Sequence, residues 1–296
     1  FGGSGPEPFA SVNGYLLIYE SSALTGLVWS SDGTAPGTVV IAEVSGKPLV
    51  LSATDRLVYF VNARRVWRTD GTKGGSFALT NPVGVPLRGS TNAASSGSGL
   101  FLAACDGSAQ CGIWFNEGAT PASVLLAEAS DVNIGDITLV AFRARAYFAY
   151  GSRLWSASIG GTGAALVFEA AQGSIRGLTA ANGRLYFAAS AGAGDELWTS
   201  DGTSQGTRAL TAFANEAPLS AVRFQTAGDR LMFVADDGAH GQELWSTDGS
   251  AAGTWRETDF AYDRAIYIGP TMAPRSLAGG LVFAASDGLV GLHLWV

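Results

Sequence analysis

Most of the residues that could do chemistry lie in three polar stretches of the C-terminal third of the chain. The stretches are SAGAGDE at 190–196, DDGAHGQE at 236–243 and SDGLVGLH at 286–293. The candidate residues are Asp195, Glu196, Asp236, Asp237, His240, Glu243, Asp287 and His293. Carboxylates and imidazoles that converge can bind a cation or a polar ligand. The alternative is a set of hairpin turns, in which Asp-Gly pairs form the turn.

Metal binding and catalysis have thin support in these stretches. Calcium is the cofactor to weigh, because other Asp/Gly-rich repeats bind it, yet it takes about six to eight oxygen ligands. Two histidines are too few to predict a zinc or copper site. The chain has no GxSxG, HExxH or P-loop, and no GxGxxG after a strand. We therefore expect no cofactor and assign no catalytic residue.

The elements that carry these stretches are revealed by a tryptophan series. Seven of the eight tryptophans follow an aliphatic residue, at steps of 38 to 50 residues: Trp29, Trp67, Trp114, Trp155, Trp198, Trp245 and Trp295. Each is preceded by a short apolar run, and most runs follow turn residues such as Asn13-Gly14. Asn-Gly before an apolar run is a strong hairpin signal. Each repeat is thus expected to hold four strands, named A to D in chain order, with tryptophan on strand C.

A second recurring feature is the turn that follows strand C. It reads SSDGTAPGT, RTDGTKGGS, TSDGTSQGT and STDGSAAGT in four repeats, with its aspartate at Asp32, Asp70, Asp201 and Asp248. The carboxylate can accept backbone N–H groups, the glycine can take positive φ, and the threonine hydroxyl can close the turn. We interpret this turn as structural; calcium binding by the aspartates is the rival interpretation.

Four short strands in about 40 to 50 residues, repeated seven times, predict a seven-bladed β-propeller with four-stranded antiparallel blades. The indole rings are expected to fill the space between neighbouring blades. We expect one domain over 1–296, with blades at approximately 6–46, 47–84, 85–131, 132–173, 174–218, 219–265 and 266–296. The last blade lacks an outer D strand, so its open edge is a place for a strand donated by a partner.

The motif ELWxxDGTxxGT resembles the repeats of that name in bacterial secreted and surface proteins, including hyalin-like repeats. The turn also resembles the Asp-box of sialidase-type propellers, but the sialidase arginine cluster and Tyr–Glu pair have no counterpart here. The resemblance implies an extracellular propeller and does not imply a reaction.

Composition bounds the partners and the compartment. The formal charge of −7 disfavours nucleic acid, and no apolar run is long enough to span a membrane as a helix. Cys105 and Cys111 bracket an expected hairpin tip, which predicts a disulfide and an oxidising compartment; the alternative is two reduced thiols. A start at Phe1 suggests processing from a precursor. We expect an extracellular, periplasmic or cell-surface location.

The function favoured by these patterns is a binding or scaffold module that engages a protein or glycan. The C–D turns are near copies, whereas the B–C connections vary, and variation marks a surface that can specialise. The B–C loops of blades five to seven are therefore the expected binding face. The alternative is a secreted enzyme that acts on polysaccharide or peptide at the mouth of the central channel.

Overall fold

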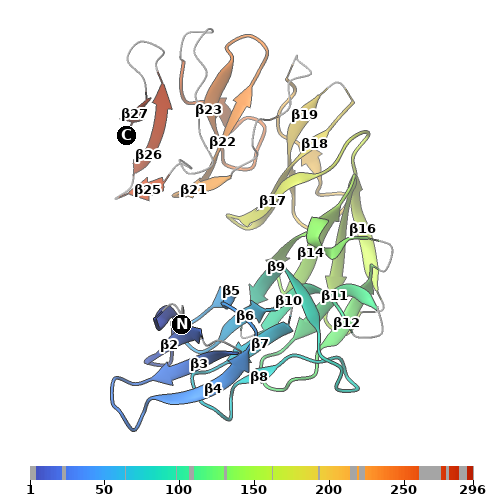
Figure 1. Cartoon of the computed structure of the whole chain (residues 1–296). Coiled ribbons are helices and arrows are strands. Elements are labelled where there is room, and N and C mark those ends of the chain that lie inside the picture. The colour runs from blue at the N-terminus through green and yellow to red at the C-terminus, as the bar shows by residue number, and fades with distance from the viewer. Residues whose placement is uncertain are drawn as a thin grey trace. The chain divides into compact units, whose positions relative to one another are not determined.

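The computed structural model describes residues 5–21, 25–63, 65–97, 99–106, 110–129, 132–161, 163–192, 194–213, 219, 224–259, 275–277, 280–286 and 292–295. Over these residues the protein is all-β, and the one helical segment is a 3-10 turn at Ile134–Asp136 (Figure 1). No helix in this part of the chain is long and apolar enough to cross a membrane. The all-β prediction is confirmed.

The chain divides into two compact units. The N-terminal unit is Phe1–Tyr147 with Ala157–Ala165, and the C-terminal unit is Phe148–Ser156 with Leu166–Val296. Repeats one, four, five and six appear as separate four-stranded antiparallel sheets, as predicted, whereas repeats two and three share one eight-stranded sheet and depart from the predicted four-stranded blades.

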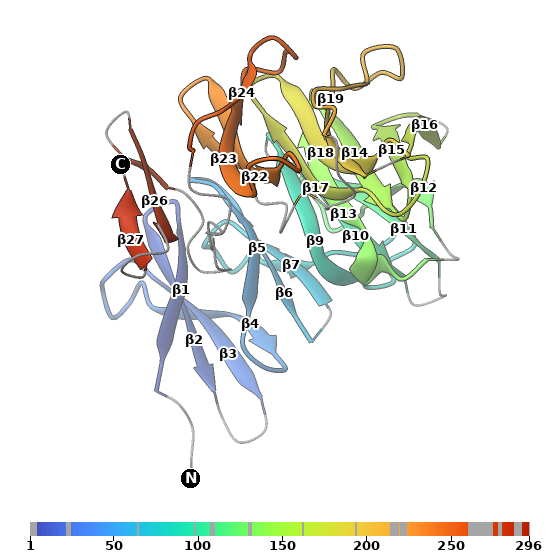
Figure 2. The ribbon, with the colours of Figure 1, turned by 90° about the horizontal axis from the view of Figure 1, so that it is seen from above.

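The N-terminal unit begins with a four-stranded sheet that runs in chain order, as Figure 2 shows. Its strands are β1 (Glu7–Val12), β2 (Tyr15–Ser21), β3 (Gly26–Ser31) and β4 (Val39–Val44). Repeats two and three form one eight-stranded sheet, joined where Arg65 of β7 pairs with Arg88 of β9. Its strands are β5 (Leu49–Ala53), β6 (Val58–Asn62), β7 (Arg65–Thr69), β8 (Phe77–Ala78), β9 (Arg88–Ser96), β10 (Gly99–Cys105), β11 (Cys111–Asn116) and β12 (Val124–Glu128).

The later repeats follow the same order. The fourth contains β13 (Thr138–Phe142), β14 (Arg145–Tyr150), β15 (Arg153–Ser158) and β16 (Ala164–Glu169). The fifth contains β17 (Arg176–Ala181), β18 (Arg184–Ser190), β19 (Asp195–Ser200) and β20 (Arg208–Ala209). The sixth contains β21 (Gln225–Ala227), β22 (Arg230–Asp236), β23 (Gln242–Thr247) and β24 (Thr254–Arg256). The last sheet has three described strands, β25 (Arg275–Leu277), β26 (Gly280–Ser286) and β27 (Leu292–Trp295).

The A–B turns show why the sequence forms hairpins at these points. Asn13 and Gly14 have φ of 50° and 81°, the left-handed conformation that Asn-Gly favours in a two-residue hairpin turn. The fourth turn, which lacks a turn signature in the sequence, adopts the same conformation with Arg143 and Ala144 at φ 49° and 57°. Hairpin pairing on both sides therefore imposes this conformation even on residues that disfavour it.

Several tryptophans pack between neighbouring sheets, as predicted. Trp67 packs against a core formed with residues of the first sheet, and Trp114, almost fully buried, lies in a core shared by repeats two and three. In the C-terminal unit the ring of Trp198 lies 4.4 Å from that of Phe168 at the end of β16, and Trp245 lies 5.2 Å from Phe213 beyond β20. The rings of Trp198 and Trp245 thus contact the trailing segment of the preceding repeat. The Trp295 side chain lies outside the described part of the chain.

The predicted disulfide is confirmed. Cys105 ends β10 and Cys111 begins β11, and the two residues are directly paired in the hairpin. The bond closes the B–C connection of the third repeat.

Candidate functional site

The Asp-Gly-Thr turns form the same hydrogen-bond network in four repeats. Asp32 accepts the backbone N–H (2.9 Å) and the hydroxyl (2.8 Å) of Thr34, and the Thr34 hydroxyl oxygen accepts the N–H of Gly37 (3.0 Å). These bonds recur at Asp70, Asp201 and Asp248, with serine in place of threonine at the last. The hydrogen bonds from Thr34 lower the pKa of the Asp32 carboxyl. The aspartates therefore close the turns.

The second glycine of each turn has a role that the sequence analysis missed. A Cβ placed on Gly37, Gly75, Gly206 or Gly253 would lie 2.0 to 2.2 Å from the nearest atom of the turn carboxylate. Glycine is required at these positions because the turn carboxylate lies so close to its Cα. Backbone conformation is not the reason, since none of these glycines has positive φ. The turn aspartate and the glycine five residues later thus form one tightly packed element.

The predicted B–C residues of repeats five and six are held in local interactions. Asp195 forms an ion pair with Arg176. The carboxylate of Asp236 accepts the N–H of Gly238 (2.8 Å), as in an Asx turn. Asp237 accepts the N–H of His240, and its other oxygen lies 2.7 Å from His240 Nδ1. Partial burial acts to raise the pKa of Asp237, but hydrogen bonds from the Ala239 and His240 backbones and the His240 ring outweigh it and lower that pKa.

The two glutamates that precede Leu-Trp are buried clamps. Glu196 accepts hydrogen bonds from the Thr211 hydroxyl and from the N–H of Phe213 (2.9 Å), which fasten the segment after β20 to β19. Glu243 accepts the hydroxyl of Thr258 in the same way after β24. Burial raises the pKa of Glu196 despite these bonds. Both glutamates therefore hold in place the segments that follow β20 and β24.

Among the predicted B–C residues whose side chains are described, the structure brings Asp237 and His240 together. Asp287 and the His293 side chain lie outside the described residues. Within the described ranges, no three His, Cys, Asp or Glu side chains form a group that could hold a metal ion.

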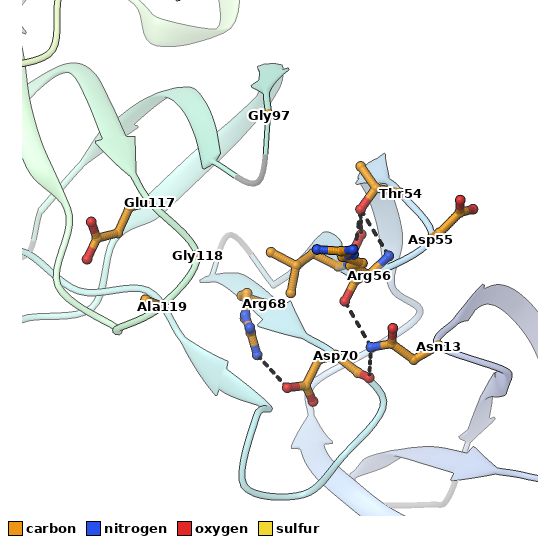
Figure 3. A pocket seen from close by; sticks show the side chains of 11 residues that line it. Asn13, Thr54, Asp55, Arg56, Arg68, Asp70, Gly97, Glu117, Gly118 and Ala119 are labelled. Atoms are coloured by element: carbon orange, nitrogen blue, oxygen red, sulfur yellow. Dashed lines mark hydrogen bonds and ion pairs between the residues drawn. The ribbon is translucent and has the colours of Figure 1, made fainter.

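A hollow of about 680 Å³ lies in the N-terminal unit, between turns of repeats one to three (Figure 3). Its lining residues come from A–B and C–D turns and, at Arg68, from strand β7, and they include two arginines and three carboxylates. They are Asn13, Thr54, Asp55, Arg56, Leu57, Arg68, Asp70, Gly97, Glu117, Gly118 and Ala119. The hollow is thus built from the A–B and C–D connections, whereas the sequence analysis favoured the B–C connections of later repeats.

Asn13 fixes one wall of the hollow. Its side-chain amide donates to the carbonyl oxygens of Arg56 (3.1 Å) and Asp70 (2.9 Å), and its backbone N–H donates to the backbone carbonyl oxygen of Asp55 (2.8 Å). The hydroxyl oxygen of Thr54 accepts the N–H of Leu57 (3.0 Å). The Asn13 side chain therefore ties the A–B turn of repeat one to both turns of repeat two.

Arg68 and Asp70 lie side by side in the hollow. Arg68 Nη1 lies 3.2 Å from Asp70 Oδ2 and also donates to the carbonyl oxygen of Gly75. The Arg68 side chain is 11% exposed, and its Nε is buried with no hydrogen-bond partner among the described residues. Burial raises the pKa of the neighbouring Tyr59 to about 12, although the positive charge of Arg68 acts to lower it. The guanidinium is therefore held through Nη1, while its Nε is buried without a hydrogen-bond partner among the described residues.

The third repeat shapes the opposite wall by departing from the shared turn. Asn116 closes this turn, because its Oδ1 accepts the N–H of Gly118 (2.9 Å) and its amide donates to Thr120 (2.9 Å). Ala119 stands where the other turns have threonine or serine. Glu117 consequently lacks the neighbouring hydroxyl that the turn aspartates bind. It lines the hollow, and its carboxylate points away from Arg68 (Figure 3).

One sequence signal could have pointed to this hollow. Arg68 directly follows Trp67, at the position that Ser30, Thr199 and Ser246 occupy in the other three repeats with this turn, and those three side chains are fully buried. A charged residue in a small, buried position is a departure from the repeat. The near identity of the other C–D turn residues conceals this single replacement.

Comparisons with known proteins bear on the fold. No family model matches the chain, and no curated protein matches it. Among solved structures, Porphyromonas gingivalis dipeptidyl peptidase 4 has a TM-score of 0.60 at 10% identity, over 92% of this chain and 48% of the peptidase. A prolyl endopeptidase has a TM-score of 0.52 at 13% identity, over 99% of this chain and 49% of its own. An oligogalacturonate lyase in complex with manganese has a TM-score of 0.51 at 12% identity, over 97% of this chain and 88% of the lyase.

These likenesses are too distant to transfer an activity, and they show the fold alone. The chain spans about half the length of the two peptidases. Together with the successive antiparallel sheets, they show that this protein has a β-propeller-like, all-β fold.

Proposed function

We propose that the chain is a seven-bladed β-propeller that acts as a binding module of an exported protein, with the hollow of the N-terminal unit as the site that holds its partner. The disulfide supports export to an oxidising compartment. The main support for the proposal is that several residues that depart from the repeat pattern line the same hollow. Arg68, Glu117 and Ala119 all replace residues of the shared pattern, and all three line the hollow.

The lining chemistry favours a protein partner over a glycan. None of the eleven lining residues is aromatic, so the hollow offers no ring on which a sugar could stack. It offers instead charged side chains from walls that hydrogen bonds hold in place. Such preorganised polar groups suit an extended peptide segment, which brings its own donors and acceptors.

A blocking substitution tests the site. The intact chain is probed with a library of short displayed peptides and with a glycan array. We expect peptide capture that Ala119→Trp abolishes, because the indole fills the hollow. Ala251→Trp is the matched control, since Ala251 is an exposed alanine in the C–D turn of repeat six. Equal capture by the chain and the Ala119→Trp variant, no peptide capture, or capture of glycans instead would contradict the proposal.

Two other surfaces are secondary proposals. The B–C loops of repeats five to seven include the assembled pair of Asp237 and His240, which suits a polar ligand. The sheet of β25, β26 and β27 offers an edge to which a partner could add a strand. Peptide capture that survives Ala119→Trp and is lost in His240→Ala would favour the loop surface.

The second candidate function is an enzyme acting on polysaccharide. It is favoured by the coverage of the oligogalacturonate lyase, because a chain of this length matches 88% of that enzyme. The test is incubation of the purified chain with oligogalacturonate and manganese, followed by measurement of unsaturated products. Manganese-dependent turnover would establish the enzyme, and its absence would leave the binding module.

A further inference from the structure

We propose that repeat six binds the turn of a partner's β-hairpin, and that this turn has the Asp-Gly-Thr or Asp-Gly-Ser sequence of the turns in this chain. The binding surface is a platform formed by Arg230, Met232 and Trp255. The inference goes beyond the proposed function, because the platform belongs to the C-terminal unit and shares no residue with the hollow.

The first step is the surface that holds such a turn in repeat five. Gly249, in the turn of repeat six, lies so close that a Cβ on it would be 2.7 Å from both Arg184 Cδ and the Tyr186 hydroxyl oxygen. Arg208 Nη2 donates to the carbonyl oxygen of Gly249 (3.3 Å). Arg184 and Tyr186 are the first and third residues of β18, and Arg208 lies in β20. These three positions of a repeat therefore form a platform for the turn of the next repeat.

Repeat one holds the turn of repeat two in the same way. A Cβ on Gly71 would lie 2.7 Å from the ring of Tyr15, the first residue of β2. The Asn13 amide donates to the carbonyl oxygen of Asp70 in the same turn (2.9 Å). Gly71 and Gly249 are both buried. Two separate pairs of repeats thus pack the first glycine of the turn against the start of strand B.

The same three positions in repeat six are Arg230, Met232 and Trp255. Arg230 and Met232 are the first and third residues of β22. Trp255 has the strand D position of Arg208, because each pairs with the residue that follows the repeat tryptophan. Trp255 is 46% exposed, and it is the one tryptophan outside the repeat series. The outer part of this platform is therefore open to solvent, with a large aromatic side chain on it.

The exposed indole is already fixed in position. Arg230 lies over its ring, 3.7 Å from the centroid, and Arg230 Nε donates to Ser246 (2.8 Å). The ring nitrogen of Trp255 donates to Glu257 (2.8 Å). A side chain that is held before binding loses little conformational freedom when a partner arrives. The platform thus offers a preorganised flat surface, as the tyrosine ring does in repeat one.

The recurring contact defines the chemistry of the partner. Gly71 and Gly249 have φ of 91° and 90°, a conformation that glycine adopts readily. Each also approaches its platform too closely for a Cβ. A hairpin whose turn carries glycine at this position therefore fits the platform, and the turns of this chain supply the model for it. The turn of repeat one provides a probe, because its Gly33 is exposed.

The experiment titrates a cyclic hairpin peptide, SSDGTAPGTVV from residues 30–40, into the intact chain by isothermal calorimetry. We expect binding, and we expect Trp255→Ala to weaken it about tenfold or more, because an exposed tryptophan dominates the surface. Val39→Ala is the matched control. Val39 is exposed at the same strand D position of repeat one, whose platform already holds the turn of repeat two. Ala119→Trp, which fills the hollow, should also leave binding unchanged. Near-UV circular dichroism confirms that the variants are folded.

The outcomes separate the inference from the proposed function. No binding, equal binding by Trp255→Ala, or equal binding of a scrambled cyclic peptide overturns the inference and leaves the proposal for the hollow standing. Loss of binding in Ala119→Trp but not in Trp255→Ala would place the hairpin in the hollow and contradict the inference. Glycan binding or self-association that Trp255→Ala abolishes, and that the hairpin peptide does not inhibit, would assign the platform to a different occupant and overturn it as well.

Discussion

The C–D turns at Asp70 and at Asp248 have the same internal hydrogen bonds but different neighbours. In both, the aspartate accepts the N–H and hydroxyl of the residue two positions later, and that hydroxyl accepts the N–H of the second glycine. In both, an arginine donates to the carbonyl of that glycine and covers the aromatic residue at the start of strand D or next to it.

The two arginines come from different strands. Arg68 belongs to β7, on strand C, whereas Arg230 begins β22, on strand B. Arg230 reaches across to Ser246, which occupies the position of Arg68 in its own repeat. In these two turns a guanidinium thus donates to the same glycine carbonyl, from strand C in one and from strand B in the other. Supplying it from strand C leaves the buried Arg68 Nε without a hydrogen-bond partner among the described residues, whereas Arg230 Nε donates to Ser246.

The largest effect is expected where the two turns are most alike. Gly75→Ala places a Cβ about 2.1 Å from the Asp70 carboxylate, so the aspartate must leave its hydrogen bonds to Thr72. We expect a loss of about 2–4 kcal/mol in the free energy of unfolding, measured by urea denaturation. Gly253→Ala should act in the same direction, because its Cβ would meet Asp248.

Gly74→Ala is the matched control for this prediction. Gly74 precedes Gly75 in the same turn, and a Cβ there would meet nothing within 4 Å. We expect little change, or a small gain from reduced freedom of the unfolded chain. Similar losses at both glycines would show that the close contact with Asp70 is not the reason for glycine.

A smaller effect is expected from making repeat six resemble repeat two. Ser246→Ala removes the acceptor of Arg230 Nε and also the hydroxyl that binds Glu257. Leaving a donor without an acceptor costs about 1–2 kcal/mol, which urea denaturation can detect. Ser30→Ala is the control, because Ser30 holds the same position in repeat one and its buried hydroxyl has no partner among the described residues. A loss at Ser30 equal to that at Ser246 would refute this account.

The sequence predicted the features that depend on spacing. The tryptophan steps located the strands, the Asp-Gly-Thr pattern located the turns, and the short cysteine spacing predicted the disulfide. Packing of Trp67, Trp198 and Trp245 between sheets also followed from the pattern. These features were predictable because strand pairing makes contacts depend on position along the chain.

The features that were not predicted depend on the reach of side chains. Glu196 was assigned to a binding face, but its carboxylate accepts a hydrogen bond from Thr211, fifteen positions later, and so holds that segment in place. The hollow was not foreseen, because Asn13, Arg68 and Glu117 come from three repeats and meet only after the sheets pack. A position-by-position alignment of the repeats would have singled out Arg68, while its contacts with Asp70 and Gly75 required the structure.

The smallest effect is expected from removing the charge of a turn aspartate, and its size depends on pH. Partial burial acts to raise the pKa of Asp70, but the hydrogen bonds from Thr72 and Arg68 outweigh it, so the pKa is lowered. The folded chain therefore binds this proton less readily than the unfolded chain. The stabilisation is present above the usual pKa of 3.8 and is lost as the pH falls through the lower folded value. Asp70→Asn should cost about 1 kcal/mol at neutral pH, and its difference from the unsubstituted chain should shrink below about pH 4. Urea denaturation at several pH values measures both.

Asp248→Asn should show a smaller difference, because Arg230 acts on Asp248 through charge alone while Arg68 also donates a hydrogen bond to Asp70. An equal or larger difference at Asp248 would show that the guanidinium of Arg68 adds nothing to its turn beyond what Arg230 provides.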